Sequence, residues 1–361
     1  MESNQNQIDP VIPKQGEPLY ETVSRAILLA IDKGIFQHTR RMPTTEELSQ
    51  QLSVSLVTTH RALQGLVAAG VLKRVRGMGT FVVENHQNLR PRLLIGLISH
   101  AEASMGDYYH GRVLDGMRQA GREHSVDIVL MDYEQTPRKD TAGHIMINPV
   151  PEKFDRVVEQ MESGKPMMIV GAESHRADVP SIDTDNIRLA AHAVEHLHKL
   201  GHRRIGYVGG GSQLGDSRDR HAGFVRACQA LNIPPQDRPL LDVPGHRLQA
   251  DESLKLNRMI SEHELTAVFA GGYYLALDVY HAASTMGLNI PDDLTVVGVD
   301  DPSSAARLRP PMTTFSQPLV HMGHAAIVSI RRACDHQNEV LRSETLQAEL
   351  IIRQSSGTPK R

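Results

Sequence analysis

The stretch "MPTTEELSQQLSVSLVTTHRAL" (residues 42–63) predicts two short helices joined by a tight turn. Pro43 and the threonines after it are typical helix start signals, and Glu46 and Glu47 lie in a first turn, where the helix dipole favours carboxylates. Ser55 follows the turn and is a suitable N-cap for the next helix. This spacing indicates a compact helical unit that needs flanking elements to complete its core.

Both flanks supply such elements. Upstream, Leu19, Val23, Ile27 and Ile31 recur at every fourth position and end before Gly34, which predicts an amphipathic helix with a C-terminal glycine. Downstream, the helix that begins at Ser55 is expected to bury Ala62, Leu66 and Ala69 and to stop at Gly70. "VLKRVRGMGTFVV" (71–83) then predicts two short strands around a glycine turn. Three helices followed by a β-hairpin form a winged helix-turn-helix.

Three segments, "PLYETVSRAILLAIDKGIF", "MPTTEELSQQLSVSLVTTHRAL" and "GVLKRVRGMGTFVV", resemble the DNA-binding domain of GntR-type bacterial regulators. The resemblance covers about residues 17–83, and its most specific part is the wing "GMGTFV". It implies double-stranded DNA as a partner, with the third helix in a major groove and the wing near the minor groove.

The departures from that family pattern are informative. Glu46, Leu56 and His60 stand where the pattern usually carries arginine, so we expect lower affinity and a different operator sequence. Leu56 and His60 are one turn apart and are expected to face outward, where a leucine can contact a thymine methyl group. The alternative is that Leu56 is an ordinary surface leucine.

Basic residues before the second helix and in the wing can replace some of the missing phosphate contacts, Lys73 among them. The full set of residues predicted to contact DNA is Arg40, Arg41, Thr44, Thr45, Ser55, Leu56, Thr58, Thr59, His60, Arg61, Arg74, Arg76, Gly77 and Gly79.

From residue 93 the pattern of apolar and polar residues changes. Apolar runs such as "RLLIGLIS", "VDIVLM", "KPMMIVGA", "TAVFAGG" and "LTVVGVDD" alternate with helical stretches near 111–123, 152–163, 187–200, 217–231, 249–262 and 275–286. Near-continuous apolar strands that alternate with helices predict an α/β fold of doubly wound parallel sheets. Ligands bind such folds beyond the carboxyl ends of the strands, where the polar loops "GDYYHG", "GDSRDRHAGF" and "DDPSSAARL" lie.

A second resemblance covers residues 93–356. "DTDNIRLAAHAVEHLHKLGHRRIGYVGG", "DSRDRHAGFVRACQALNI" and "PPMTTFSQPLVHMGHAA" resemble the effector domain of LacI-type repressors, which is similar to periplasmic sugar-binding proteins. It implies two subdomains joined by three crossing segments, a homodimer, and a small effector such as a sugar. The expected organisation is a flexible tail (1–16), a winged helix (17–84), a linker (85–92) and a sensor (93–361). The combination of these two domains in one chain resembles arabinose-responsive repressors.

The second resemblance also implies an effector site. Arg220 matches the arginine that binds the effector in this family, and Asp300 matches the carboxylate that accepts hydrogen bonds from sugar hydroxyls. Asp107 and Tyr109 lie in the loop where the family places an amide and a stacking aromatic side chain. The family often has an Asn-Asp pair where this chain has Gly272 and Tyr273, so the aromatic ring of Tyr273 is expected to replace a hydroxyl acceptor.

One connection is short for this fold. Between "VDIVLM" and "HIMIN" the chain has only "DYEQTPRKDTAG", whereas a crossover between parallel strands normally contains a helix and about a dozen or more residues. We therefore expect the first subdomain to lack one covering helix.

Net charge and the spacing of cysteines and histidines narrow the classes of protein that the sequence fits. Net charge is -3, so a DNA surface must be a local patch, and Cys228 and Cys334 lack the spacing of a disulfide scaffold or zinc module. His192 and His196 lie four apart, but no third ligand is spaced nearby, so neither a metal site nor a cofactor is expected. The polar N-terminus and the absence of an apolar run of about 20 residues indicate a cytoplasmic protein.

These patterns predict a ligand-responsive transcriptional regulator, and more specifically a repressor of carbohydrate-utilisation genes released by a sugar. Two alternatives belong to other classes: an enzyme of sugar metabolism, or a sugar-binding protein whose DNA-binding domain no longer functions. A transporter receptor does not fit, because it needs export and has no use for a winged helix. An enzyme needs converging acid, base or metal residues, which the sequence does not show.

Overall fold

The computed structural model describes residues 8, 18–32, 34–36, 40–83, 92–99, 107–134, 138–161, 164–211, 214–335 and 340–360. The chain forms two compact units, of which the first holds Met1–Leu93 and Gly121–Asp127 and the second holds Leu94–Ala120 and Ile128–Arg361. The predicted tail (1–16) lies outside the described residues except for Ile8, and the predicted linker (85–92) does so except for Arg92.

The first unit contains the predicted winged helix. Its elements are α1 (Leu19–Asp32), α2 (Thr45–Gln51), α3 (Leu56–Ala68), β1 (Leu72–Val75) and β2 (Gly79–Val82). The two strands pair antiparallel, with Leu72 opposite Val82 and Val75 opposite Gly79. The order and type of all five elements are as predicted.

The core of the winged helix is built from the apolar faces of its helices. Ile27, Leu48 and Leu63 are fully buried, and Ile8 also lies in this core, which the predicted flexible tail did not include. The prediction for Ala69 is wrong because this residue is exposed. Leu63 lies on the inward face of α3 in its place, one residue after Ala62.

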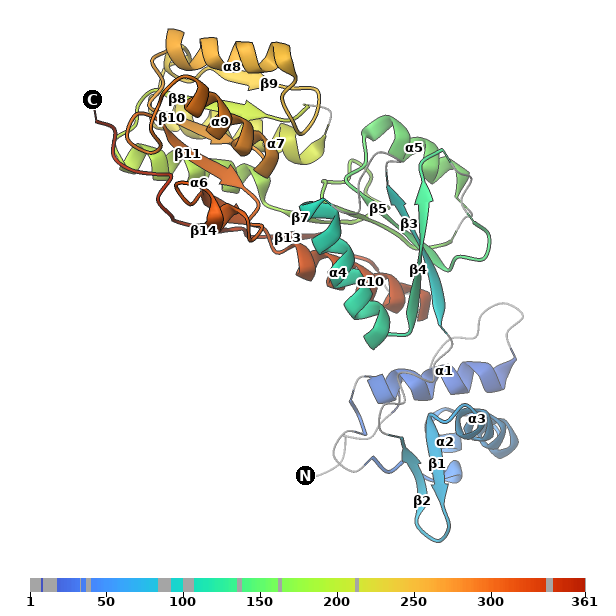
Figure 1. The fold of residues 1–361 in the computed structure, drawn as a ribbon. Coiled ribbons are helices and arrows are strands. Elements are labelled where there is room, and N and C mark those ends of the chain that lie inside the picture. Colours follow the sequence, from blue (N-terminus) through green and yellow to red (C-terminus); the bar gives the residue numbers. More distant parts are fainter. Residues whose placement is uncertain are drawn as a thin grey trace. The chain divides into compact units, whose positions relative to one another are not determined.

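The second unit contains two six-stranded sheets, each covered by helices as the predicted doubly wound fold requires (Figure 1). The first sheet has the order β13-β7-β6-β5-β3-β4. Its strands and helices are β3 (Leu93–Ser99), α4 (Tyr108–Glu123), β4 (Val126–Asp132), β5 (Gly143–Ile147), α5 (Pro151–Gln160), β6 (Met167–Val170), β7 (Ser181–Thr184), α10 (Leu319–Asp335) and β13 (Glu344–Leu346).

The second sheet has the order β14-β12-β11-β10-β8-β9, and only β14 is recorded antiparallel to its neighbour. Its elements are α6 (Asn186–Lys199), β8 (Ile205–Gly209), α7 (Gly215–Ala230), β9 (Leu240–Asp242), α8 (Ala250–Glu262), β10 (Ala267–Ala270), α9 (Tyr273–Thr285), β11 (Thr295–Val299), β12 (Thr313–Ser316) and β14 (Glu349–Ile351), with 3-10 turns at Pro235–Asp237 and Ala305–Arg307. Helices α6 and α7 pack on one face, and α8 and α9 on the other.

The chain passes between the two sheets three times. It does so between β7 and α6, between β12 and α10, and between β13 and β14. Each passage is only a few residues long, so the two subdomains are tied together at one side. This is the three-segment connection that the LacI-type resemblance implies.

The short connection between β4 and β5 contains no helix in its described residues, 133–134 and 138–142, in agreement with the predicted loss of one covering helix. Tyr133 and Met131 are buried with Phe154 of α5 and close part of this face. The buried His144 lies so near Gly96 that a Cβ atom on the glycine would stand 2.6 Å from the ring. The strand face is thus filled by residues of β4, β5, their connection and α5.

Candidate DNA surface and effector cleft

Side-chain caps fix the starts of both α2 and α3. Thr44 Oγ1 accepts a hydrogen bond from Glu47 N at 3.2 Å, and Glu47 Oε2 accepts one from Thr44 N at 2.7 Å, which gives α2 a capping box. Ser55 Oγ accepts a hydrogen bond from Thr58 N at 3.1 Å and so caps α3. The caps satisfy backbone donors at the starts of both helices, and the Ser55 cap directly follows the turn between α2 and α3.

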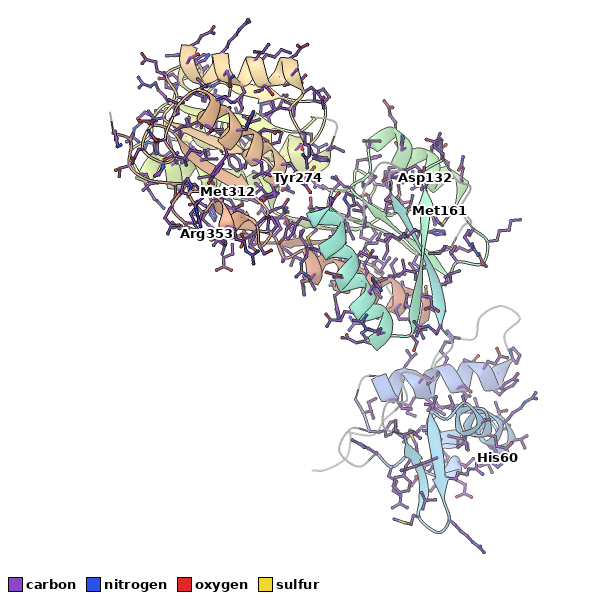
Figure 2. The ribbon with its side chains drawn as sticks, in the orientation of Figure 1. His60, Asp132, Met161, Tyr274, Met312 and Arg353 are labelled. Carbon is purple, nitrogen blue, oxygen red and sulfur yellow. The ribbon has the colours of Figure 1, made fainter. Side chains whose placement is uncertain are left out.

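The outer face of α3 begins with two exposed apolar residues. Leu56 is 51% exposed and Val57 is 79% exposed. His60 is also exposed one turn further along (Figure 2), and the Arg61 guanidinium lies 4.1 Å from the centroid of the Tyr20 ring. Sequence reasoning missed Val57, although its position beside Leu56 and outside the inward-facing set could have revealed it.

Thr59 requires a correction. Its side chain is fully buried, and its hydroxyl donates to the Ser55 carbonyl oxygen at 3.2 Å. It therefore supports the first turn of α3 from inside, and we remove it from the predicted DNA surface. Thr58 stays partly exposed, with its hydroxyl 2.8 Å from Ser55 Oγ.

The predicted basic residues and wing glycines lie at the surface of the same domain. The exposed ones are Arg40, Arg41, Lys73, Arg74, Arg76, Gly77 and Gly79, together with the N-cap residues Thr44 and Ser55 and the predicted arginine replacement Glu46, while Thr45 is half-buried.

The wing turn depends on its glycines. Gly77 and Gly79 have φ values of 76° and 118°, which glycine adopts without the steric cost of a side chain. A Cβ atom on Gly79 would lie 3.4 Å from Arg41 Nε, so the guanidinium passes close to the hairpin backbone. Met78, between the glycines, is 61% exposed at the tip of the wing.

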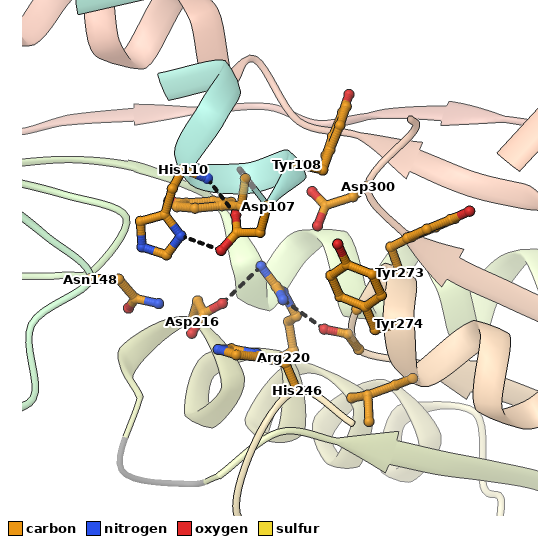
Figure 3. Close-up of a pocket in the computed structure, with 14 residues that line it drawn as sticks. Asp107, Tyr108, His110, Asn148, Asp216, Arg220, His246, Tyr273, Tyr274 and Asp300 are labelled. Carbon is orange, nitrogen blue, oxygen red and sulfur yellow. Dashed lines mark hydrogen bonds and ion pairs between the residues drawn. The ribbon is translucent and has the colours of Figure 1, made fainter. Parts of the chain in front are cut away.

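All five predicted effector residues line one cleft of the second unit (Figure 3). The cleft contains about 620 Å³ of empty space, part of which is open solvent. Its lining comes from segments that follow β3, β5, β8, β9, β10 and β11. Those segments leave the carboxyl ends of parallel strands, where doubly wound folds bind ligands.

Arg220 is 4% exposed and is held at three points. Its Nε donates to Asn186 Oδ1 at 2.8 Å. Its Nη1 donates to the Gly271 carbonyl oxygen at 2.7 Å, and its Nη2 lies 3.2 Å from Asp216 Oδ2 (Figure 3). This rigid fork positions the guanidinium at the wall of the cleft.

Asp107 and Asp300 contribute carboxylates from different subdomains. Asp107 precedes α4, and its two oxygens accept from His110 N and contact His110 Nδ1, both at 2.8 Å. Asp300 follows β11 with a φ of 72°, and Gln317 Nε2 donates to its Oδ1 at 2.7 Å. Burial raises the pKa of Asp300. For Asp107, burial acts upward, the His110 contact acts downward, and the net pKa shift is downward.

Tyrosines supply the apolar part of the lining. The hydroxyl of Tyr109 lies against the backbone of Gly171, where a Cβ atom would clash with it. Tyr273 donates from its hydroxyl to Ser304 Oγ at 2.7 Å, and the Tyr108 hydroxyl donates to the Asp301 carbonyl oxygen at 3.1 Å. Tyr274 meets the Tyr273 ring edge to face, with centroids 5.5 Å apart.

Several lining residues were missed by sequence reasoning. Asp216 lies one turn before Arg220 in α7, so the i, i+4 spacing of an acid and an arginine could have revealed it. Tyr274 follows a residue that was predicted. Asn148 and His246 carry no comparable sequence signal. Among the described atoms, the buried oxygens Asp216 Oδ1 and Asn148 Oδ1 have no hydrogen-bond partner.

The described lining contains no serine, threonine or cysteine, so no such nucleophile faces the cleft. A capped, exposed recognition helix with a wing and a two-subdomain ligand cleft in one chain define the class of ligand-responsive transcriptional regulators. Among the described residues, no helix is long and apolar enough to cross a bilayer.

Comparison with known proteins identifies both parts. Residues 19–82 match the family of bacterial regulatory proteins, gntR family, and residues 194–356 match the periplasmic binding protein-like domain family. The chain is a transcriptional regulator that joins a GntR-type winged helix to a periplasmic binding protein-like sensor domain.

Two relatives align with most of this chain and with nearly all of their own length. An HTH-type transcriptional regulator in the aml 5' region of Streptomyces limosus is 27% identical over 88% of this chain and 95% of its own length. The arabinose metabolism transcriptional repressor of Geobacillus stearothermophilus is 24% identical over 94% of this chain and 98% of its own. A LacI family regulator from Enterococcus faecium, solved with bound ribose, has the same fold: TM-score 0.63, 19% identity, 73% of this chain and 99% of that one.

Proposed function

We propose that the chain represses carbohydrate-utilisation genes and leaves its operator when a sugar or sugar derivative binds the cleft. The observation that carries this proposal is the union in one chain of an exposed recognition helix and a cleft lined by carboxylates, tyrosines and one held arginine. The relative from Geobacillus stearothermophilus, which represses arabinose metabolism, matches nearly the whole chain and supports the same role.

We propose that a homodimer in the cytoplasm reads two half-sites, with α3 of each protomer in a major groove and the wing near the minor groove. Leu56, Val57 and His60 supply base contacts, and Arg40, Arg41, Arg74 and Arg76 supply phosphate contacts. The functional boundaries in this proposal are a tail (1–16), a winged helix (17–84), a linker (85–92) and a sensor (93–361).

Release follows from closure of the two sensor subdomains on the effector. Asp107 and Tyr109 belong to one subdomain, and Arg220, Tyr273 and Asp300 belong to the other. A ligand that contacts both sets binds the closed arrangement more tightly than the open one, so it shifts the population towards closure. Closure then changes the spacing or mobility of the two winged helices, and operator affinity falls.

An electrophoretic or anisotropy titration with a panel of pentoses and hexoses tests this function. The purified full-length protein is expected to bind DNA from upstream of its own gene and to release it with one sugar. Asp107→Asn is expected to weaken the sugar response while operator affinity without sugar stays unchanged, because Asp107 belongs to the sensor. If the protein binds a sugar but binds this DNA no more tightly than unrelated DNA, the proposal that it represses its own promoter is wrong.

A further inference from the structure

The charges that line the cleft are unbalanced. Three carboxylates, Asp107, Asp216 and Asp300, stand beside a single guanidinium, that of Arg220. The other titratable lining groups, the tyrosines aside, are the imidazoles of His110 and His246. A site of this composition repels phosphate and carboxylate groups and attracts a cation.

Arg220 is already committed to neighbouring groups. Its ion pair is with Asp216, and its remaining recorded hydrogen bonds go to Asn186 and the Gly271 carbonyl. Of the other two carboxylates, Asp107 contacts His110 and Asp300 accepts from the neutral amide of Gln317. Among the described residues, the side chains that contact the Asp107 and Asp300 carboxylates are thus an imidazole and a neutral amide, and neither is a guanidinium or ammonium group.

These two carboxylates come from opposite subdomains, and both line the cleft (Figure 3). Burial is the main cause that raises the pKa of Asp300, and the negative charges of Asp216 and Asp107 act in the same direction. Like charges on two subdomains oppose closure. A cation between them removes that repulsion and contacts both subdomains at once.

The aromatic lining and the unpaired acceptors suit the same kind of ligand. The faces of tyrosine rings attract ammonium groups, and the Arg247 guanidinium already lies 4.2 Å from the centroid of the Tyr274 ring. The described atoms Asp216 Oδ1 and Asn148 Oδ1 are buried acceptors without a partner. Such acceptors need hydrogen-bond donors from the ligand, which hydroxyl and ammonium groups provide.

We propose that the effector is a polyhydroxylated amine, such as an amino sugar, whose protonated amino group binds between Asp107 and Asp300. This inference rests on the proposed function, because it takes the cleft to be the effector site. The hydroxyl groups donate to Asp216 and Asn148, and the carbon faces contact the tyrosines. Sugar phosphates and sugar acids are disfavoured by the same carboxylates.

Calorimetry on the full-length protein at neutral pH tests the proposal. Glucosamine, galactosamine and mannosamine are compared with glucose, galactose and mannose, with the three N-acetylated amines, and with glucose 6-phosphate and glucuronate. One amine is expected to bind at least about tenfold more tightly than both its parent sugar and its N-acetyl form, a difference of about 1.4 kcal/mol.

Two variants locate the amino group. Asp300→Asn and Asp107→Asn each keep the shape of the side chain and one acceptor oxygen and remove its charge. Both are expected to reduce the preference for the amine over its parent sugar at least severalfold, with melting curves measured to verify folding. Unchanged preference in two folded variants would overturn the assignment of these carboxylates.

The panel separates failure of this inference from failure of the proposed function. Tight binding of a neutral sugar, with no gain from the amine, overturns the amine and leaves a sugar-responsive regulator intact. Preferred binding of glucose 6-phosphate or glucuronate overturns the charge argument. No binding by any member, in calorimetry and in melting shifts, overturns both the amine and the sugar response.

Discussion

At the residue scale, the proposed DNA surface carries Glu46, Leu56 and His60 at positions where the GntR-type pattern usually has arginine. Leu56 and Val57 expose apolar groups at the start of α3, where base edges are read. Apolar contacts do not release counterions, so they add sequence preference without adding salt dependence. The basic residues of the wing and of the segment before α2 are left to supply the electrostatic part of binding.

This division predicts different phenotypes for two kinds of variant. Val57→Ala and Leu56→Ala are each expected to weaken operator binding by about 1 kcal/mol or more while the slope of affinity against salt stays the same. Arg74→Ala is expected to weaken all DNA sequences alike and to reduce the salt slope by about one ion. Salt titrations by fluorescence anisotropy distinguish them, and a lower slope in Val57→Ala would contradict the apolar reading.

His144 makes the sensor sensitive to acid. It is 1% exposed and its Nε2 lies 3.0 Å from Thr141 Oγ1, and burial lowers its pKa from 6.5 to about 4. Because the folded-state pKa is depressed, the unfolded chain takes up the proton more readily as pH falls. The stability from neutral His144 is therefore present above pH 6.5 and is lost as pH falls towards 4.

Between pH 7 and pH 5, this group is expected to reduce the free energy of unfolding of the sensor by about 2 kcal/mol. Urea unfolding at the two pH values measures the loss, and His144→Asn serves as the variant from which this titration is absent. The variant should be less stable at pH 7 and less sensitive to acid. Equal pH dependence in both proteins would contradict a buried neutral imidazole.

At the element scale, two glycines allow helices α4 and α10 to cross at close range. A Cβ atom on Gly116 would clash with the Val320 carbonyl oxygen, and one on Gly323 would clash with the Val113 carbonyl oxygen. Backbone atoms cannot move aside as a flexible side chain can. The crossing therefore depends on both glycines, and it holds α4, which starts next to Asp107, against the sheet of the first subdomain.

Gly116→Ala is expected to destabilise the sensor by about 1–3 kcal/mol, as overpacking does. Gly65→Ala is the matched control, because Gly65 lies in α3 and a Cβ there has no described atom within 4 Å. The control is expected to stabilise α3 by up to about 1 kcal/mol, since alanine favours helix more than glycine. Thermal unfolding compares the stabilities of the two variants. A Gly116→Ala variant that is as stable as the unsubstituted protein would rule out the close crossing.

Most helices and the strands with long apolar runs could be predicted from sequence because their signals are local. The strand β7 was missed, since "SIDT" has no apolar alternation and its Asp183 and Thr184 are buried through hydrogen bonds inside the protein. Strands β13 and β14 have three residues each and exist only because partners far along the chain pair with them. Such pairings leave little trace in their own sequence.

The residues of the cleft also include some that could be predicted from sequence and some that could not. Arg220 and Asp300 could be placed from the resemblance, and both reach the cleft. The closeness of Asp107 to Asp300 depends on how two subdomains meet, which no local pattern encodes. The missing partners of Asp216 Oδ1 and Asn148 Oδ1 could be recognised only in the folded chain.

At the scale of the whole molecule, the proposed regulation couples two events, DNA binding by the winged helix and ligand binding by the sensor. In the proposed function, the winged helix binds DNA through a modest set of charges and several apolar contacts, and the sensor closes on a small polar ligand. Each event has its own residues, so variants of the cleft should change the response to effector without changing DNA affinity. Arg220→Ala is unsuited to this purpose, because loss of a buried partner leaves Asp216 unpaired and is expected to cost about 3–5 kcal/mol of stability.

The most direct test is fluorescence anisotropy of the full-length protein on labelled DNA from upstream of its own gene, titrated first with salt and then with the panel of sugars and amino sugars. The account predicts specific binding with a modest salt slope, followed by release with one polyhydroxylated ligand and retention in Asp107→Asn. Binding no tighter than to unrelated DNA, or specific binding that no ligand bound in the cleft can release, would contradict it.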